Sequence, residues 1–232
     1  MIPFRDNVAA RRYPVMTVSL IVLNVAVFLY EITLPPARLE ALVLSYGTVP
    51  AYFAPGAAEG QGLPVAFLSL FTSMFLHGGW LHVLGNMWYL WIFGDNVEDR
   101  MGHFSFLVFY LLCGLAGGLA HVVFNLSSTI PSIGASGAVA GVLGAYLISY
   151  PFARILTIVP LFFFWPIIEL PAILVLGSWF LIQFLYGTMA LGSTTAEAMG
   201  GVAWWAHIGG FLTGILLLRF FASSPSHRRK IF

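Results

Sequence analysis

The longest run without a formal charge constrains this chain most, because no Asp, Glu, Lys or Arg occurs between residues 101 and 153. Of the 232 residues, 59% are hydrophobic and 8% are charged, whereas soluble domains carry about 25% charged residues. This composition predicts an integral membrane protein. The net charge of +1 argues against nucleic acid as a partner. Cys113 is the single cysteine, so an intramolecular disulfide is excluded.

Six apolar stretches approach the length of about 20 residues that a membrane-spanning helix needs. They cover residues 13–30, 78–94, 104–126, 136–150, 170–190 and 201–218. Six crossings put both ends of the chain on one side, and that side receives every Lys and Arg except Arg38. Because basic residues favour the cytoplasmic side, the sequence predicts an all-α, six-transmembrane-helix bundle with both termini cytoplasmic. Residues 1–12 would form a cytoplasmic segment, 13–222 the multi-pass membrane domain, and 223–232 a basic cytoplasmic tail.

Two further apolar stretches, 63–76 and 155–168, are short and contain proline. Stretches of this length are expected to be interfacial or re-entrant. The acidic cluster after residue 94, from Asp95 to Asp99 and including Glu98, is expected to be a solvated helix end. The small, polar loop 187–201 is of the kind that can act as a lid.

Four polar side chains fall at one depth, in the outer third of the predicted bundle. His82 and Asn86 lie roughly 6 and 12 Å below the start of the second stretch, at 1.5 Å per residue. Their i, i+4 spacing places them on one helical face. His207 lies roughly 9 Å into the sixth stretch, and Ser136 begins the short fourth stretch, roughly 8 Å below the outer surface. Since polar groups in lipid are costly and must find partners, these four are expected to meet.

Such a set of side chains suits acyl transfer. Ser136 would be the nucleophile, and His207 would act first as general base and then as general acid. Backbone N–H groups at the start of the helix, with His82 and Asn86, could bind the oxyanion. No carboxylate is expected at this depth, so the strongest mechanism is a Ser–His dyad. The alternative interpretation is that a lone membrane serine among small residues only packs helices together.

Three motifs together resemble those of the rhomboid intramembrane serine proteases. They are GASGAVAG around Ser136, AHIGG around His207, and HGGWLHVLGN from His77 to Asn86. The resemblance implies a rhomboid bundle in which Ser136 and His207 are catalytic. It implies that His82, Asn86 and the Ser136 N–H bind the oxyanion, and that His77, Gly134, Gly137 and Gly210 support the site.

The resemblance also implies cleavage of single-pass transmembrane proteins near their outer end, within the lipid bilayer, without a cofactor or a metal ion. Two positions depart from the family pattern. Phe67, Leu68 and Ser69 stand where many rhomboids carry a Trp-Arg pair, and Ala140 stands where some carry a tyrosine that stacks on the histidine. Trp204 and Trp205 are therefore candidates to support His207.

Two other function classes stay open. The first is a rhomboid-fold binding or chaperone protein without catalysis, which would need a lost serine or histidine, although both are present. The second is a transporter or channel, which usually places Asp or Glu in mid-membrane; none is expected there unless Glu169 lies deeper than predicted. By analogy, the short termini favour a prokaryotic plasma (inner) membrane. The sequence does not constrain the oligomeric state.

Overall fold

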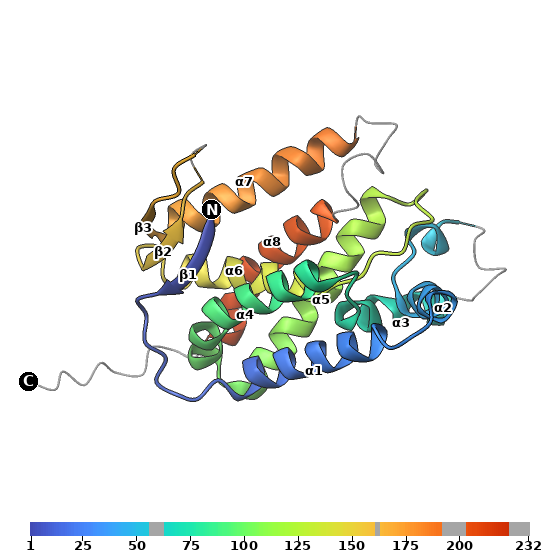
Figure 1. The fold of residues 1–232 in the computed structure, drawn as a ribbon, viewed down its shortest axis with the longest axis horizontal. Helices are drawn as coiled ribbons and strands as arrows, with labels where there is room; N and C mark the ends of the chain where they lie inside the picture. Colours follow the sequence, from blue (N-terminus) through green and yellow to red (C-terminus); the bar gives the residue numbers. More distant parts are fainter. Residues whose placement is uncertain (56–62, 161–162, 192–202, 223–232) are drawn as a thin grey trace, which may run out of the picture.

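A computed structural model describes residues 1–55, 63–160, 163–191 and 203–222. Its main body is a bundle of six apolar helices, one at each predicted stretch (Figure 1). These helices are α1 (Val15–Glu31), α4 (Trp80–Met101), α5 (His103–Phe124), α6 (Ser136–Ser149), α7 (Ala172–Leu191) and α8 (Trp204–Phe221). The predicted lid loop falls on the end of α7 and on residues outside the described ranges, and the basic tail lies wholly outside them.

Helix length alone supports fewer crossings than the sequence predicts. Three of the described helices, α5, α7 and α8, are long and apolar enough to cross a membrane. A fourth crossing is possible if α3 (Leu63–Thr72) and the 3₁₀ turn η3 (Ser73–Phe75) are counted with α4, from which they bend by 80°. The helices α1 and α6 are shorter, at 17 and 14 residues. The chain is thus an integral membrane protein, and the six crossings stay a prediction.

The short helix α6 lies at the centre of the bundle, between α4, α5 and α8 (Figure 1). Its residues from Gly137 to Tyr146 are all buried. Three glycines on α6 let α8 approach its backbone closely. A Cβ added to Gly144 would contact the Phe211 carbonyl oxygen, and one added to Gly214 would lie 2.6 Å from the Gly141 carbonyl carbon. Small residues at a helix crossing permit this approach in membranes.

The expectation of an all-α fold is wrong at one end of the bundle, where three strands form an antiparallel sheet in the order β1-β2-β3. Strand β1 (Ile2–Asp6) pairs with β2 (Arg154–Ile158), which pairs with β3 (Ile167–Pro171). The stretch 155–168, expected to be interfacial or re-entrant, therefore supplies most of β2 and the start of β3. The surface beside the sheet is strongly apolar, since the side chains of Phe152, Phe163 and Phe164 are exposed.

Side chains of the bundle hold β1 in place. The Asp6 carboxylate accepts hydrogen bonds from the Tyr146 hydroxyl and from the Asn96 amide. The Trp88 indole N–H donates to the Pro3 carbonyl oxygen over 2.6 Å. The N-terminal segment is therefore part of the fold, attached to both α4 and α6.

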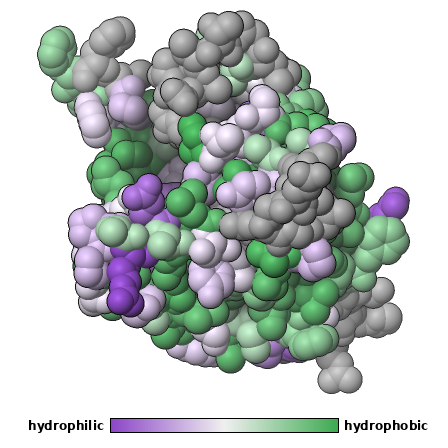
Figure 2. Space-filling view, turned by 90° about the vertical axis from the view of Figure 1, so that its right-hand side faces the viewer, coloured by the Kyte–Doolittle hydropathy of each residue, from purple (hydrophilic) through white to green (hydrophobic). Residues whose placement is uncertain are grey.

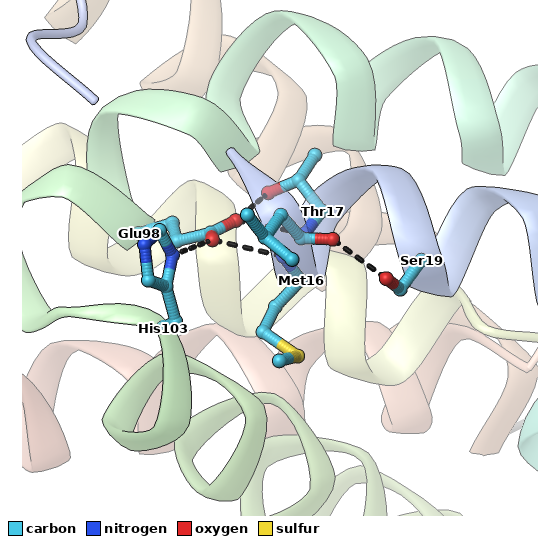
Figure 3. A network of polar contacts seen from close by, with 6 residues as sticks. Met16, Thr17, Ser19, Glu98 and His103 are labelled. Atoms are coloured by element: carbon cyan, nitrogen blue, oxygen red, sulfur yellow. Dashed lines mark hydrogen bonds and ion pairs between the residues drawn. The ribbon is translucent and has the colours of Figure 1, made fainter. Parts of the chain in front are cut away.

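Glu98 is not a solvated helix-end residue as expected, because only 1% of it is exposed. Its carboxylate accepts hydrogen bonds from the Met16 N–H, the Thr17 N–H and the Thr17 hydroxyl, over 2.9, 2.7 and 2.7 Å (Figure 3). The His103 ring lies 2.5 Å away on the other side. Since the first N–H groups of a helix lack partners within it, Glu98 caps α1 from the end of α4.

The remaining elements cover the opposite end of the bundle. They are α2 (Pro36–Tyr46), the 3₁₀ turn η1 (Pro50–Phe53), α3 and η3. The helices α4, α6 and α8 begin at this end, whereas β1 and the end of α4 lie at the other (Figure 1). Figure 2 looks onto the end with α2 and α3, where strongly hydrophilic side chains are sparse among hydrophobic and weakly polar ones.

Candidate functional site

Ser136 is the first residue of α6, as the sequence predicts. Within the described ranges no side chain caps this helix start, so its first N–H groups can bind an anion, aided by the positive end of the helix dipole. The residue two before it, Gly134, has a φ of +121°, which favours glycine. A Cβ there would also lie 2.5 Å from the His82 ring nitrogen Nε2. Gly134 therefore lets the loop before Ser136 approach His82.

His207 lies in the first turn of α8, beside the start of α6. A Cβ added to Gly137 would lie 3.4 Å from the Ala206 carbonyl oxygen and 3.8 Å from the Ala206 Cβ. The chain neighbours of Ser136 and His207 are thus in van der Waals range. Gly210, one turn further along α8, comes close enough that a Cβ would contact the Gly137 carbonyl oxygen. Gly137 and Gly210, two of the three glycines expected to support the site, are therefore among those that let α6 and α8 approach each other.

Ser136, His207, His82 and Asn86 all line one cavity of about 930 Å³ at this end of the bundle. The cavity runs from the loop 128–133 to Trp179 on α7 and Trp204 on α8. Within the described chain, no hydrogen bond joins the Ser136 hydroxyl to the His207 ring. Such bonds are often long until a substrate binds. The depth argument from the sequence correctly grouped these four residues.

His77 lies outside the lining of this cavity among the described residues, and 3% of it is exposed. Its Nε2 lies 3.2 Å from the Asn86 amide nitrogen, and its ring meets the His82 ring edge-on at 5.1 Å. Its backbone N–H donates to both carboxylate oxygens of Glu31, over 3.2 and 3.3 Å. The position of His77 agrees with a supporting role, because it braces both expected oxyanion-binding residues.

The support of His207 comes mainly from α7, which the sequence interpretation did not identify. The Gln183 carbonyl oxygen Oε1 lies 2.7 Å from His207 Nδ1. The Trp179 ring lies 5.7 Å from the His207 ring at an interplanar angle of 35°. Gln183 is the one amide within its apolar stretch, and the rule that intramembrane polar groups need partners could have identified it.

The two tryptophans expected to support His207 differ in outcome. The Trp204 ring lies edge-on to the His207 ring, with centroids 6.3 Å apart. Trp205 instead stacks on Phe124, with ring centroids 3.7 Å apart. Trp179, which the sequence did not single out, therefore lies nearer to the His207 ring than either of the two expected tryptophans.

Comparisons with known proteins give one consistent result. The Rhomboid domain family matches residues 65–224. Rhomboid protein 1, mitochondrial, from Saccharomyces cerevisiae is 31% identical over 153 residues, which is 64% of this chain and 40% of that protein. RHOMBOID-like protein 6, mitochondrial, from Arabidopsis thaliana is 34% identical over 148 residues, covering 64% and 41%. Rhomboid protease GluP from Bacillus subtilis is 45% identical over 78 residues, covering 34% and 15%. The chain thus spans less than half of the length of these three relatives.

Proposed function

Since the chain belongs to the rhomboid family, we propose that it is an intramembrane serine endopeptidase with Ser136 and His207 as its catalytic dyad. The carrying observation is that both residues line one cavity with His82 and Asn86, at the uncapped start of α6. The substrates would be single-pass transmembrane proteins, hydrolysed near their outer end. The relative named as a protease, GluP, agrees with this activity.

In the proposed reaction the Ser136 hydroxyl oxygen attacks the carbonyl carbon of the scissile peptide, and its proton passes to His207 Nε2. The resulting oxyanion is held by N–H groups at the start of α6 and by donors on His82 and Asn86. His207 then gives the proton to the leaving amine, and the acyl group stays on Ser136. A water molecule attacks this ester, His207 takes its proton, and that proton returns to Ser136 as the acid leaves.

The orientation in the membrane belongs to the same proposal. Six crossings with both termini cytoplasmic would place the cavity near the outer face, because the basic residues gather toward the other end. The membrane itself is less constrained. The matched relatives include two named as mitochondrial and one from a bacterium, so a prokaryotic plasma membrane rests on the analogy alone.

The test is cleavage of a tagged model transmembrane protein in proteoliposomes, together with labelling by a fluorophosphonate probe. The variants are Ser136→Ala and His207→Ala. Ser149→Ala is the matched control, because it removes a serine at the far end of the same helix. Cleavage and labelling should be lost in the first two variants and kept in the control.

Cleavage that persists in Ser136→Ala would refute the assignment of the nucleophile. If folded native protein neither cleaves nor takes up the probe, the catalytically silent binding or chaperone function replaces the protease function.

A further inference from the structure

Gln183 is a buried amide on α7, where the neighbouring residues are exposed and apolar. Gln183 is 6% exposed, whereas Ile182, Phe184 and Leu185 are 46%, 44% and 50% exposed. A buried polar side chain is costly without a hydrogen-bond partner. Within the described part of the chain, Gln183 has one side-chain partner, which is His207 Nδ1 at 2.7 Å.

This contact fixes which ring nitrogen carries the proton. A neutral imidazole has one N–H donor and one acceptor nitrogen. Because the Gln183 Oε1 atom can only accept, the Nδ1 atom of His207 must donate, and the lone pair is left on Nε2. Nε2 is the atom that a general base needs in order to take the proton of the Ser136 hydroxyl.

The same helix also restrains the plane of the ring. Trp179 lies four residues before Gln183, so both side chains point to one face of α7. Its ring centroid lies 5.7 Å from that of His207. One helix therefore contacts the imidazole through an amide at Nδ1 and through an indole ring tilted by 35° to it.

We propose that Gln183 is a positioning residue that acts through His207, in the place where many serine hydrolases use a carboxylate. This proposal rests on the proposed protease function. Gln183 is not among the described residues that line the cavity, so it does not reach the substrate. An amide holds the tautomer without adding a negative charge beside the ring, which distinguishes this arrangement from a Ser-His-Asp triad.

Replacing Gln183 by methionine removes the acceptor and keeps an unbranched side chain of similar length. Both tautomers then become populated and the ring is free to turn, so kcat should fall about 10- to 100-fold. KM should stay within about twofold, because the substrate contacts are unchanged. Ser178→Ala is the matched control, since among the described residues the Ser178 hydroxyl bonds only within α7, to the Val175 carbonyl oxygen.

Gln183→Glu is the rescuing variant, because a carboxylate oxygen can accept from Nδ1 at the same place. It should recover most of the native kcat above neutral pH. The acidic limb of its pH–rate profile should move to higher pH, since a carboxylate stabilises the imidazolium. A purely structural role for Gln183 would not produce this shift. Equal losses of kcat in the Met and Glu variants, or native kcat in the Met variant, would overturn the proposal.

A second measurement keeps the two proposals separable. In Ser136→Ala protein, ¹⁵N spectra of the histidine rings, assigned with the help of His207→Ala, should show His207 protonated at Nδ1. Adding Gln183→Met should give mixed tautomers. If His207 is protonated at Nε2 in the protein that retains Gln183, the role of Gln183 is refuted, even where cleavage is shown to depend on Ser136. Cleavage by Ser136→Ala would refute the assignment of Ser136 as the nucleophile, while the spectra would still report the Gln183 contact.

Discussion

The close approach of α6 and α8 gives the sharpest prediction about stability, through Gly210→Ala. A Cβ on Gly210 would contact the Gly137 carbonyl oxygen and lie 2.8 Å from its carbonyl carbon and 3.2 Å from its Cα. All three neighbours are backbone atoms, so no side chain can turn away to make room. The two helices must therefore separate at the point where they carry Ser136 and His207.

The size of the effect follows from two opposing contributions. Overpacking a filled interior costs about 1–3 kcal/mol, and a clash with helix backbone belongs at the upper end, about 3 kcal/mol. Alanine is favoured over glycine in a helix by about 1 kcal/mol. The net loss of about 2 kcal/mol should lower the melting temperature by about 4–8 °C in a domain of this size. Proteolysis should also fall, because His207 lies three residues before Gly210.

Cys113 supplies the assay, because it is the single cysteine and is 0% exposed. A fluorogenic thiol reagent will react with it only when the bundle opens, so its signal on heating reports unfolding. Gly177→Ala on α7 is the control, because nothing lies within 4 Å of its added Cβ; its melting temperature should be unchanged or higher. If Gly210→Ala has the native melting temperature and cleaves at the native rate, the contact between Gly210 and the Gly137 backbone does not set the distance between α6 and α8.

Three further predictions concern side chains. Glu98→Gln replaces one accepting carboxylate oxygen by an NH₂ group that cannot accept from the N–H groups of α1. The free energy of unfolding should fall by about 2–3 kcal/mol, seen as a lower melting temperature in the same thiol assay; an unchanged melting temperature would contradict the capping role. Tyr146→Phe removes one hydrogen bond to Asp6, so the backbone amides of β1 should exchange with deuterium about fivefold faster, as measured by mass spectrometry. Exchange at the native rate would contradict the role of Tyr146 in holding β1. Trp179→Ala should lower kcat about 3- to 10-fold, whereas Trp179→Phe should keep the native kcat. Equal kcat values for the two variants would contradict a role for an aromatic ring beside His207.

The six helices of the bundle were predictable because each one satisfies a local rule. A stretch of apolar residues without charges is visible in any window, and the start of α6 at Ser136 follows a glycine-containing turn. The sheet was not predictable in this way. β1 pairs with residues about 150 positions further along the chain, and such long-range pairing leaves no local periodicity. The stretch 155–168, which supplies most of β2 and the start of β3, was predicted to be interfacial because it is short, apolar and interrupted by prolines.

The error on Glu98 has a different origin. Its position after an apolar stretch, in a charged segment that includes Arg100, is compatible with a solvated helix end. Its partners are backbone N–H groups of Met16 and Thr17, which every sequence contains and no motif marks. The grouping of Ser136, His82, Asn86 and His207 succeeded because depth can be counted from helix ends. Gln183 could be marked from sequence as an intramembrane amide in need of a partner, but pairing it with His207 required knowing which face of α7 turns inward.

The residues of the site are held by two separate parts of the bundle, the α1–α4 pair and α7. Buried carboxylates hold α1 against the α4 region at both ends, through Glu98 at one end and through Glu31 and the His77 N–H at the other. The expected oxyanion donors on α4 thus belong to a braced pair of helices. Within the described chain, the Gln183 amide makes the one side-chain hydrogen bond from α7 to another element. Perturbing α7 should therefore misplace the proposed general base while leaving the oxyanion donors in position, so that kcat and the rate of covalent fluorophosphonate labelling fall while KM stays near its native value.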